Sequence, residues 1–276
     1  MELPMGLKET EYEEQERRLK EKMAKVRHTL IVMSGKGGVG KSTVAVNLAY
    51  AFSMSGKKAG ILDIDLHGPN IAKMLGIEER LIFTRESGIE PVEAGENLKA
   101  VSIALLGRDS DQPIIWRGPA KTAVIRQFLS DVNWGDLDYL VVDSPPGTGD
   151  EPLSVCQFIP GASGIIIVTT PQDVAVLDAR KSVLFAKELN IPVVGIIENM
   201  SGFVCPHCHA ETAIFKKGGG EKAARELQVP FLGGVPFQPE FVEFGDKGTP
   251  FVSFHHKSKS ADAFMKIVAR IEEFVR

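Results

Sequence analysis

A glycine-rich segment, GKGGVGKS at residues 35–42, directly follows the apolar run 29–34 and leads into a stretch of helical composition. It fits the pattern G-x-x-x-x-G-K-[ST], whose backbone N–H groups surround phosphate oxygens while the following helix contributes its dipole. In this pattern Lys41 neutralises phosphate charge and Ser42 ligates magnesium. The order of strand, loop and helix therefore predicts a phosphate-binding loop in an α/β fold. The residues expected to contact the nucleotide here are Gly35, Gly37, Gly38, Val39, Gly40, Lys41, Ser42 and Thr43.

Further apolar runs follow, and they alternate with segments of helical periodicity. The runs cover residues 29–34, 59–65, 98–104, 138–145, 164–171, 192–200 and 231–237, and the helical segments cover 42–55, 119–130, 174–189 and 219–228. Continuous apolar runs are typical of strands buried on both faces, and intervening helices supply the crossovers of a parallel sheet. We therefore predict one α/β domain over residues 28–276, with a mostly parallel sheet flanked by helices.

Residues 1–27 are dense in charges of both signs, which predicts a solvated helical arm without chemistry of its own. The formal net charge of the whole chain is −4, which argues against a general electrostatic grip on nucleic acid. No apolar run approaches the roughly 20 residues that a membrane span needs. The N-terminus also lacks the apolar core of a signal peptide. We therefore expect a cytoplasmic protein with neither nucleic acid nor membrane among its partners.

Lys36 is one lysine more than a phosphate-binding loop requires. A solvated loop lysine is the simplest interpretation, but GKGGVGKST resembles the deviant Walker A motif of the MinD/ParA/nitrogenase-iron-protein class. That resemblance implies that Lys36 reaches the phosphates of a partner subunit in a nucleotide-sandwich dimer. A cation supplied by the partner stabilises charge on the transferring phosphoryl group, as an arginine finger does. Hydrolysis of ATP would then depend on the geometry of the dimer.

Three aspartates lie at strand ends where an ATPase needs acidic groups. Asp143 ends the run 138–145, as the magnesium-side aspartate of a Walker B motif does, and the glycine-bearing PPGTGD (145–150) follows it. Asp63 and Asp65 end another run, and their spacing places them on one face of the strand. The class resemblance implies that Asp65 positions the attacking water and that Asp63 is its neighbour and an outer-shell magnesium partner. A turn that simply favours aspartate is the alternative for this pair.

Asn199 ends the run 192–200 and matches the position that reads the adenine ring in the same class. The resemblance also places backbone around residues 236–238 beside the base. These assignments complete the expected site for ATP and Mg²⁺.

Cys205 and Cys208 form a CxxC pair, with His207 and His209 beside them. Two thiolates do not complete a tetrahedral metal site. Two pairs meeting at a twofold axis could hold one iron–sulfur cluster or one zinc ion. Alternatively, His209 could join the pair in a partial zinc site, or the two thiols could act as a redox dithiol.

Several separate motifs resemble the Mrp/ApbC family of P-loop ATPases, which is associated with iron–sulfur cluster assembly and transfer. They are DIDLHGPNI, WRGP, DSPPGTGDE, ENMSGFVCPHC and GGGEKAARELQVPFLGGVP, spread over residues 28–276. The resemblance implies a homodimer that bridges a 4Fe–4S cluster through Cys205 and Cys208 and delivers it to apoproteins. The additional N-terminal four-cysteine site of some eukaryotic relatives has no counterpart, since no cysteine precedes Cys156. Cys156 itself lies in an apolar stretch and is predicted to be a buried core residue.

Two other functions fit the nucleotide motifs. A MinD/ParA-type positioning ATPase, with structural zinc at the CxxC pair, would use nucleotide to switch its binding to a membrane or to DNA. Such a protein needs a basic amphipathic tail or a basic surface. Residues 260–276 do show helical apolar spacing but carry three charges of each sign, which favours docking against the sheet. A nitrogenase-like reductase or a metal insertase is the second alternative. The cluster cysteines of such reductases are expected singly on separate segments, whereas this chain pairs them, which disfavours this function.

Overall fold

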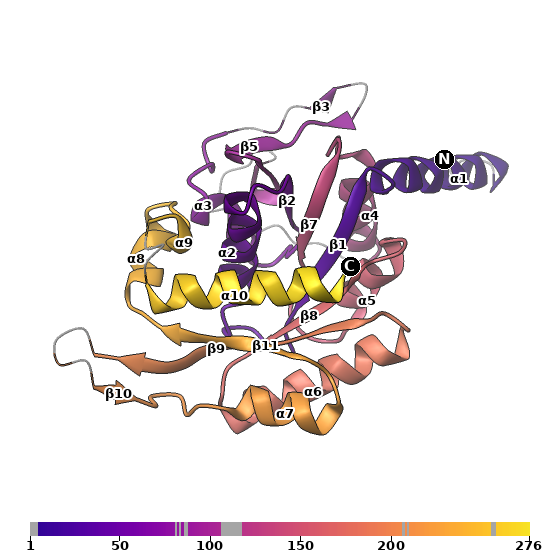
Figure 1. Cartoon of the computed structure of the whole chain (residues 1–276). Coiled ribbons are helices and arrows are strands. Elements are labelled where there is room, and N and C mark those ends of the chain that lie inside the picture. The colour runs from indigo at the N-terminus through magenta and orange to yellow at the C-terminus, as the bar shows by residue number, and fades with distance from the viewer. Residues whose placement is uncertain are drawn as a thin grey trace.

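The computed structural model describes residues 5–80, 82, 84–85, 88–105, 118–205, 208, 210–254 and 258–276. Within these residues a nine-stranded sheet runs in the order β10-β9-β8-β1-β7-β2-β6-β5, and β11 also pairs with β9 (Figure 1). The parallel strands are β1 (Val26–Met33), β2 (Ala59–Asp63), β6 (Leu98–Ser102), β7 (Leu137–Asp143), β8 (Gly164–Thr169), β9 (Val193–Val204) and β11 (Phe231–Phe237). Each overlaps one of the predicted apolar runs.

Short antiparallel strands were not predicted from the sequence. They are β5 (Val92–Gly95) beside β6, β10 (Glu211–Thr212) beside β9, and the separate hairpin of β3 (Thr84–Arg85) and β4 (Gly88–Ile89). Two to four residues of mixed polarity give too short a pattern to distinguish a strand from a loop. These additions leave the predicted class, an α/β fold with a mostly parallel sheet flanked by helices, confirmed.

Helices cover both faces of the sheet (Figure 1). The helices α2 (Lys41–Met54) and α10 (Lys259–Phe274) pack together on one face, with the short α9 (Phe251–Phe254) beside them. On the other face α4 (Gly118–Asp131) packs with α5 (Asp150–Phe158), and α6 (Asp173–Glu188) packs with α7 (Gly219–Leu227). The short α3 (Ile71–Met74), η1 (Ile103–Leu105) and α8 (Glu240–Asp246) complete the described elements.

The direction of the crossovers explains why helices lie on both faces of the sheet. From β1 the chain crosses to β2 in one direction along the sheet, and from β7 it crosses to β8 in the other. Because such crossovers are right-handed, α2 and α5 must lie on opposite faces. The carboxyl ends of β1, β2 and β7 meet where the crossover direction reverses, which is where open α/β sheets bind ligands.

The N-terminal helix α1 (Met5–Met23) packs along α4. Leu19 and Met23 are buried, and the guanidinium of Arg126 on α4 lies 3.6 Å from the ring centre of Tyr12. Burial of Leu19 and Met23 stabilises this packing by about 1.5–3 kcal/mol per side chain. The charged arm is therefore docked on the domain along its C-terminal half.

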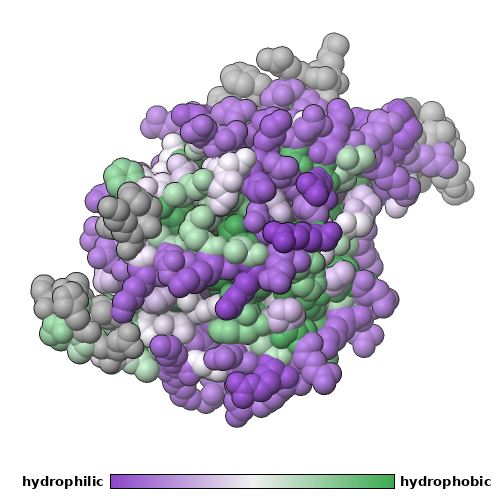
Figure 2. All heavy atoms as spheres, in the orientation of Figure 1, coloured by the Kyte–Doolittle hydropathy of each residue, from purple (hydrophilic) through white to green (hydrophobic). Residues whose placement is uncertain are grey.

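The C-terminal helix α10 docks on the domain, as its balanced charge predicted. Phe264, Ile267 and Ile271 are buried against β11 and α2. Figure 2 shows the outer side of α10 as a hydrophilic band with hydrophobic residues on either side of it. No helix within the described ranges is both long and apolar enough to cross a lipid bilayer.

Candidate functional site

The phosphate-binding loop joins β1 to α2 and has the predicted form. Gly38 and Gly40 adopt φ of +81°, a conformation that glycine takes without strain. A Cβ at Gly38 would have no atom within 4 Å, so one side of the loop is open. Gly40 precedes α2 without a side-chain cap, which leaves the first N–H groups of the helix available to an anion.

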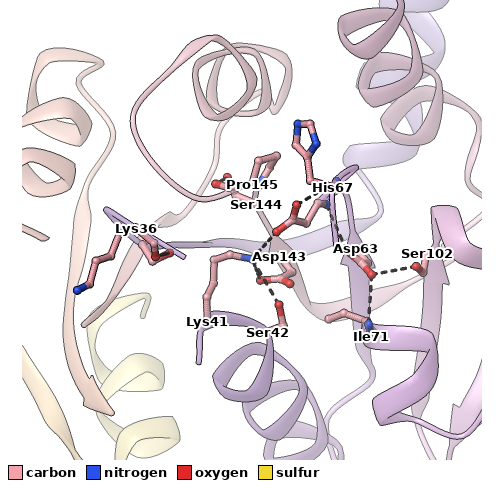
Figure 3. A network of polar contacts seen from close by, with 12 residues as sticks. Lys36, Lys41, Ser42, Asp63, His67, Ile71, Ser102, Asp143, Ser144 and Pro145 are labelled. Atoms are coloured by element: carbon pink, nitrogen blue, oxygen red, sulfur yellow. Dashed lines mark hydrogen bonds and ion pairs between the residues drawn. The ribbon is translucent and has the colours of Figure 1, made fainter. Parts of the chain in front are cut away.

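Lys41 is buried among carboxylates. Its Nζ lies 2.7 Å from Oδ1 of Asp143 and 3.5 Å from Oδ2 of Asp65 (Figure 3). Parallel pairing of β2 and β7 sets Asp63 directly beside Asp143, so all three predicted aspartates lie at this edge of the sheet. Asp143 and Asp65 thus contact the ammonium group that a phosphate-binding loop directs at phosphate oxygens.

Asp63 is fully buried, and its contacts hold the loop that follows β2. Its Oδ2 accepts hydrogen bonds from Oγ of Ser102 at 2.9 Å and from the backbone N–H of Ile71 at 3.3 Å. Burial, followed by the charge of Asp143, raises the pKa of Asp63 to about 8. The pKa of Asp143 is also raised, by burial, although the Lys41 charge opposes the shift. Burial thus opposes ionisation of both Asp63 and Asp143 in the folded chain.

The oxygen donors at this site fit a magnesium ion. Oδ2 of Asp143 is buried without a hydrogen-bond partner among the described residues, and the Ser42 hydroxyl lies 3.5 Å from Nζ of Lys41 in the same cluster. Carboxylate and hydroxyl oxygens are ligands that Mg²⁺ prefers. Ser42 and Asp143 are therefore the residues available to hold the ion, with Asp63 behind them.

Lys36 lies on the same loop but does not join the acidic cluster. Its side chain points away from Lys41 and Asp143 (Figure 3), and its backbone carbonyl accepts a hydrogen bond from Oγ of Ser34 at 2.9 Å. The half-buried Lys36 side chain is therefore separate from the acidic cluster around Lys41.

The segment 145–150 lies against the phosphate loop. The N–H of Gly147 donates to the carbonyl of Ser34 at 2.7 Å, and the N–H of Ser144 donates to the carbonyl of Val32. These backbone bonds tie the segment after β7 to the end of β1. A change in the conformation of the phosphate loop can therefore be transmitted to this segment through backbone hydrogen bonds.

A cavity of about 300 Å³ opens beside the phosphate loop. Asn199 and Met200 at the bend of β9 line it, together with Pro236 and Phe237 of β11 and Gly40 of the loop. Nδ2 of Asn199 donates to the carbonyl of Val39 at 2.9 Å. The volume falls at the low end for small-molecule pockets. The predicted base-reading residue and the backbone near 236–238 therefore share one cavity next to the phosphate site.

The thiol pair lies at the far end of β9, where the strand runs past its predicted end at residue 200 into a hairpin with β10. The N–H of Cys205 donates to the carbonyl of Ala210 at 3.0 Å. Cys205 is half-buried and Cys208 is exposed, whereas Cys156 is buried on α5 as predicted. His207 and His209 lie outside the described residues, and no cluster of three metal-binding side chains occurs within the described part.

Glu198, just before Asn199, holds β9 in place, and this role was not predicted from the sequence. Its carboxylate is buried and accepts hydrogen bonds from Oγ of Ser201 and from the N–H groups of Gly218 and Gly220, at 2.6 to 2.8 Å. These contacts fasten β9 to the start of α7, where a carboxylate is favoured by the helix dipole. A glutamate inside an otherwise apolar run was the available signal, because such a charge needs buried partners.

Between Glu198 and the thiols, β9 is irregular. Met200 has φ of +55° and Gly202 has φ of +80°. A left-handed conformation is costly for methionine, on the order of 1 kcal/mol, and persists only where surrounding contacts impose it. The strand therefore changes direction between the cavity beside the phosphate loop and Cys205.

Comparison with known proteins agrees with this arrangement. Residues 25–272 match the family described as NUBPL iron-transfer P-loop NTPase. An iron-sulfur cluster carrier protein of Methanocaldococcus jannaschii is 54% identical over 95% of this chain and 90% of its own length. The cytosolic Fe-S cluster assembly factor CFD1 of Kluyveromyces lactis is 47% identical over 84% of each chain.

Among solved structures, a nucleotide-binding protein of Archaeoglobus fulgidus in complex with ADP has a TM-score of 0.75 and 37% identity, covering 84% of this chain and 91% of its own. The cell division protein MinD of Aquifex aeolicus has a TM-score of 0.64 over 89% of this chain and 97% of its own, but at 22% identity it is similar in fold alone. The family match and the close relatives together cover nearly the whole described domain. The chain belongs to the NUBPL iron-transfer P-loop NTPase family.

Proposed function

We propose that this protein is an ATP-hydrolysing carrier that binds an iron–sulfur cluster between two copies of the chain and passes it to apoproteins. One observation carries the proposal: a single strand, β9, holds Asn199 at the cavity beside the phosphate loop and ends at Val204, directly before Cys205. The names of the relatives from M. jannaschii and K. lactis support the cluster as cargo. The cytosolic relative also supports a cytoplasmic location.

In the nucleotide reaction, Lys41 leaves its carboxylate partners and binds the phosphates, while the N–H groups at the start of α2 hold their oxygens. Asp65, released from Lys41, orients the attacking water. Ser42 and Asp143 hold Mg²⁺, which neutralises phosphate charge when bound. Lys36 of each chain reaches the phosphates of the other chain, and the direction of its side chain in Figure 3, away from Lys41 and Asp143 of its own chain, supports this role.

The cluster is cargo held by thiolates. The chain has three cysteines, and Cys156 is buried on α5, so each chain offers Cys205 and Cys208. A 4Fe–4S cluster takes four thiolates. Two copies related by a twofold axis supply that number, and the exposed position of Cys208 on a projecting hairpin supports such a meeting.

A positioning ATPase with a structural zinc is less well supported. The likeness to MinD is below 25% identity and concerns the fold alone. The C-terminal helix, which such a protein would use at a surface, has its apolar side buried against β11 and α2.

Anaerobic reconstitution with iron and sulfide tests the cargo. We expect a brown dimer with about four irons per two chains, read by absorbance, metal analysis and mass in solution. Cys205→Ala/Cys208→Ala should lose the iron and keep the fold, and Cys156→Ala, which leaves the hairpin intact, should keep the iron. A colourless dimer with one tightly bound zinc in the wild type would contradict the proposal.

Mixing two inactive variants tests whether Lys36 acts on the partner chain. Lys36→Ala and Lys41→Ala should each abolish most ATP hydrolysis, measured as phosphate release. In a mixed dimer, the Lys36→Ala chain keeps its phosphate loop and receives Lys36 from the Lys41→Ala chain. Random pairing should restore about a quarter of wild-type activity. Absence of recovery in dimers proven to be mixed would refute action across the interface, and Lys266→Ala on the outer side of α10 is the control.

A further inference from the structure

A histidine, a lysine and a glutamate from three segments meet beside the nucleotide site without belonging to the residues assigned above. His67 lies in the loop after β2, Lys121 on α4 and Glu151 on α5. Nζ of Lys121 lies 2.6 Å from Oε1 of Glu151 and 2.9 Å from Nε2 of His67, and that nitrogen lies 3.2 Å from the same Glu151 oxygen. Each member contacts both others, so the cluster joins the loop to two helices.

The ionic core of the cluster is largely shielded from water. The side chains of Lys121 and Glu151 are 17% and 21% exposed, whereas that of His67 is 63% exposed. Burial alone would raise the pKa of Glu151, but hydrogen bonds from Lys121 and His67 outweigh it and lower that pKa. A half-buried ion pair of this kind restrains its elements more than an exposed pair does.

The cluster is connected to the proposed water-orienting group. The backbone N–H of His67 donates to Oδ1 of Asp65 at 3.3 Å, while Oδ2 of Asp65 faces Lys41. The His67 ring points away from the acidic cluster (Figure 3), so its main chain faces Asp65 and its side chain faces the helices. Glu151 follows PPGTGD immediately, and that segment is bonded to the phosphate loop through Gly147.

We infer that Glu151, with Lys121, is a positioning residue that fixes His67 and thereby holds the Asp65 carboxylate in the orientation needed for ATP hydrolysis. The inference rests on the proposed ATPase function and assigns the orientation of its water-activating group to residues outside the nucleotide site. When Lys41 moves to the phosphates, Asp65 loses that contact. The His67 N–H then provides the remaining hydrogen bond to the Asp65 carboxylate among the described residues, and the cluster holds this donor in place.

Steady-state phosphate release by the full-length protein tests the inference. Glu151→Gln and Lys121→Met should each lower kcat by about 10- to 100-fold while the KM for ATP changes less than twofold, because catalytic geometry and not substrate binding is disturbed. Lys121→Arg, which keeps the charge and the donors, should retain most of kcat. Glu226→Gln removes another ion pair between helices, with Arg180, and should leave kcat unchanged.

The double variant Glu151→Gln/Lys121→Met should be no slower than the worse single variant, since both act through His67. Melting temperature and mass with ATP are measured alongside. An unchanged kcat, a raised KM with normal kcat, or a kcat loss that follows loss of folding or of the dimer would overturn the inference. Wild-type protein without ATPase activity would instead refute the proposed function, which keeps the two failures distinct.

Discussion

The nucleotide site and the thiol hairpin differ in how much of each is complete within one chain. At the nucleotide site Asp63 and Asp143 are buried side by side at the ends of central strands, and buried Lys41 pairs with Asp143. The hairpin lies at the sheet edge, where β10 contributes two paired residues and Cys208 is exposed. One region is built around internal partners, and the other presents its reactive groups outward.

This difference shows where each region obtains its stability and its ligands. Buried charges must be satisfied within the fold, so the nucleotide site is organised before ATP arrives. The hairpin is held at its base by Glu198, and its two cysteines are half-buried and exposed rather than enclosed. A region with less burial can rearrange around a ligand at lower cost.

The largest expected effect is on the pH dependence of stability. Because Asp63 has a pKa of about 8 in the folded chain, the folded state binds a proton that the unfolded chain releases near pH 4. This contribution is complete below pH 4 and is lost as pH rises through 8. Between those values the free energy of unfolding of the nucleotide- and magnesium-free protein should fall by about 1.4 kcal/mol per pH unit.

Urea unfolding across this pH range measures the effect. Asp63→Asn should flatten the profile, whereas Cys208→Ser in the hairpin should leave it unchanged. A wild-type profile that is flat between pH 5 and 8 would show that Asp63 is ionised throughout, and the contrast between the two regions would weaken.

The rate of thiol alkylation should differ between the thiol hairpin and the buried part of the domain. Burial raises the pKa of Cys156 to about 12, while Cys208 is exposed. At pH 8 iodoacetamide should modify Cys208 at least about 1000-fold faster than Cys156, since the thiolate is the reactive form. Mass spectrometry of timed digests measures both rates, and denatured protein, in which the sites react alike, is the control. Equal rates in the folded chain would contradict the assigned burial.

Lys41→Met should weaken ADP binding on the order of 100-fold, as expected for loss of charge-assisted hydrogen bonds worth about 3 kcal/mol. Cys208→Ser should leave ADP affinity unchanged. Calorimetric titration measures both, well below the melting temperature, because Asp143 also loses its ion pair. A matching loss in Cys208→Ser would mean that the two regions are coupled even without a cluster.

The smallest expected effect is the difference in stability lost when each of two glycines is replaced by alanine. A Cβ at Gly35 would lie 2.3 Å from backbone atoms of Asp178 on α6, so Gly35→Ala should cost about 2–3 kcal/mol of stability. Gly202 has φ of +80°, but its nearest neighbour is Cδ of Lys217 at 3.9 Å, so Gly202→Ala should cost about 1 kcal/mol from backbone strain alone. Urea unfolding at one pH ranks the two, and equal costs would contradict the tighter packing around the phosphate loop.

The central architecture followed from the sequence because each buried parallel strand leaves a continuous apolar run, as in 164–171. The phosphate loop was equally readable, since its glycines and lysine are adjacent in the chain. Glu151 and Lys121 were not predictable, because their partners lie in other segments and become neighbours only through the crossovers. The same holds for Glu198, whose donors on Gly218 and Gly220 lie some twenty residues away.

The ion pair between Lys41 and Asp143 means that any anion binding to Lys41 must compete with a carboxylate of the same chain. These two groups belong to one fold, so the effective concentration of the carboxylate at the lysine far exceeds that of any free anion. A single chloride or inorganic phosphate gains too little to displace it. A nucleotide polyphosphate binds the helix N–H groups, the glycine loop and the nucleoside cavity together, and can therefore exchange with Asp143. Selectivity for long phosphate chains carrying a nucleoside thus arises from an internal contact that every incoming anion must first break.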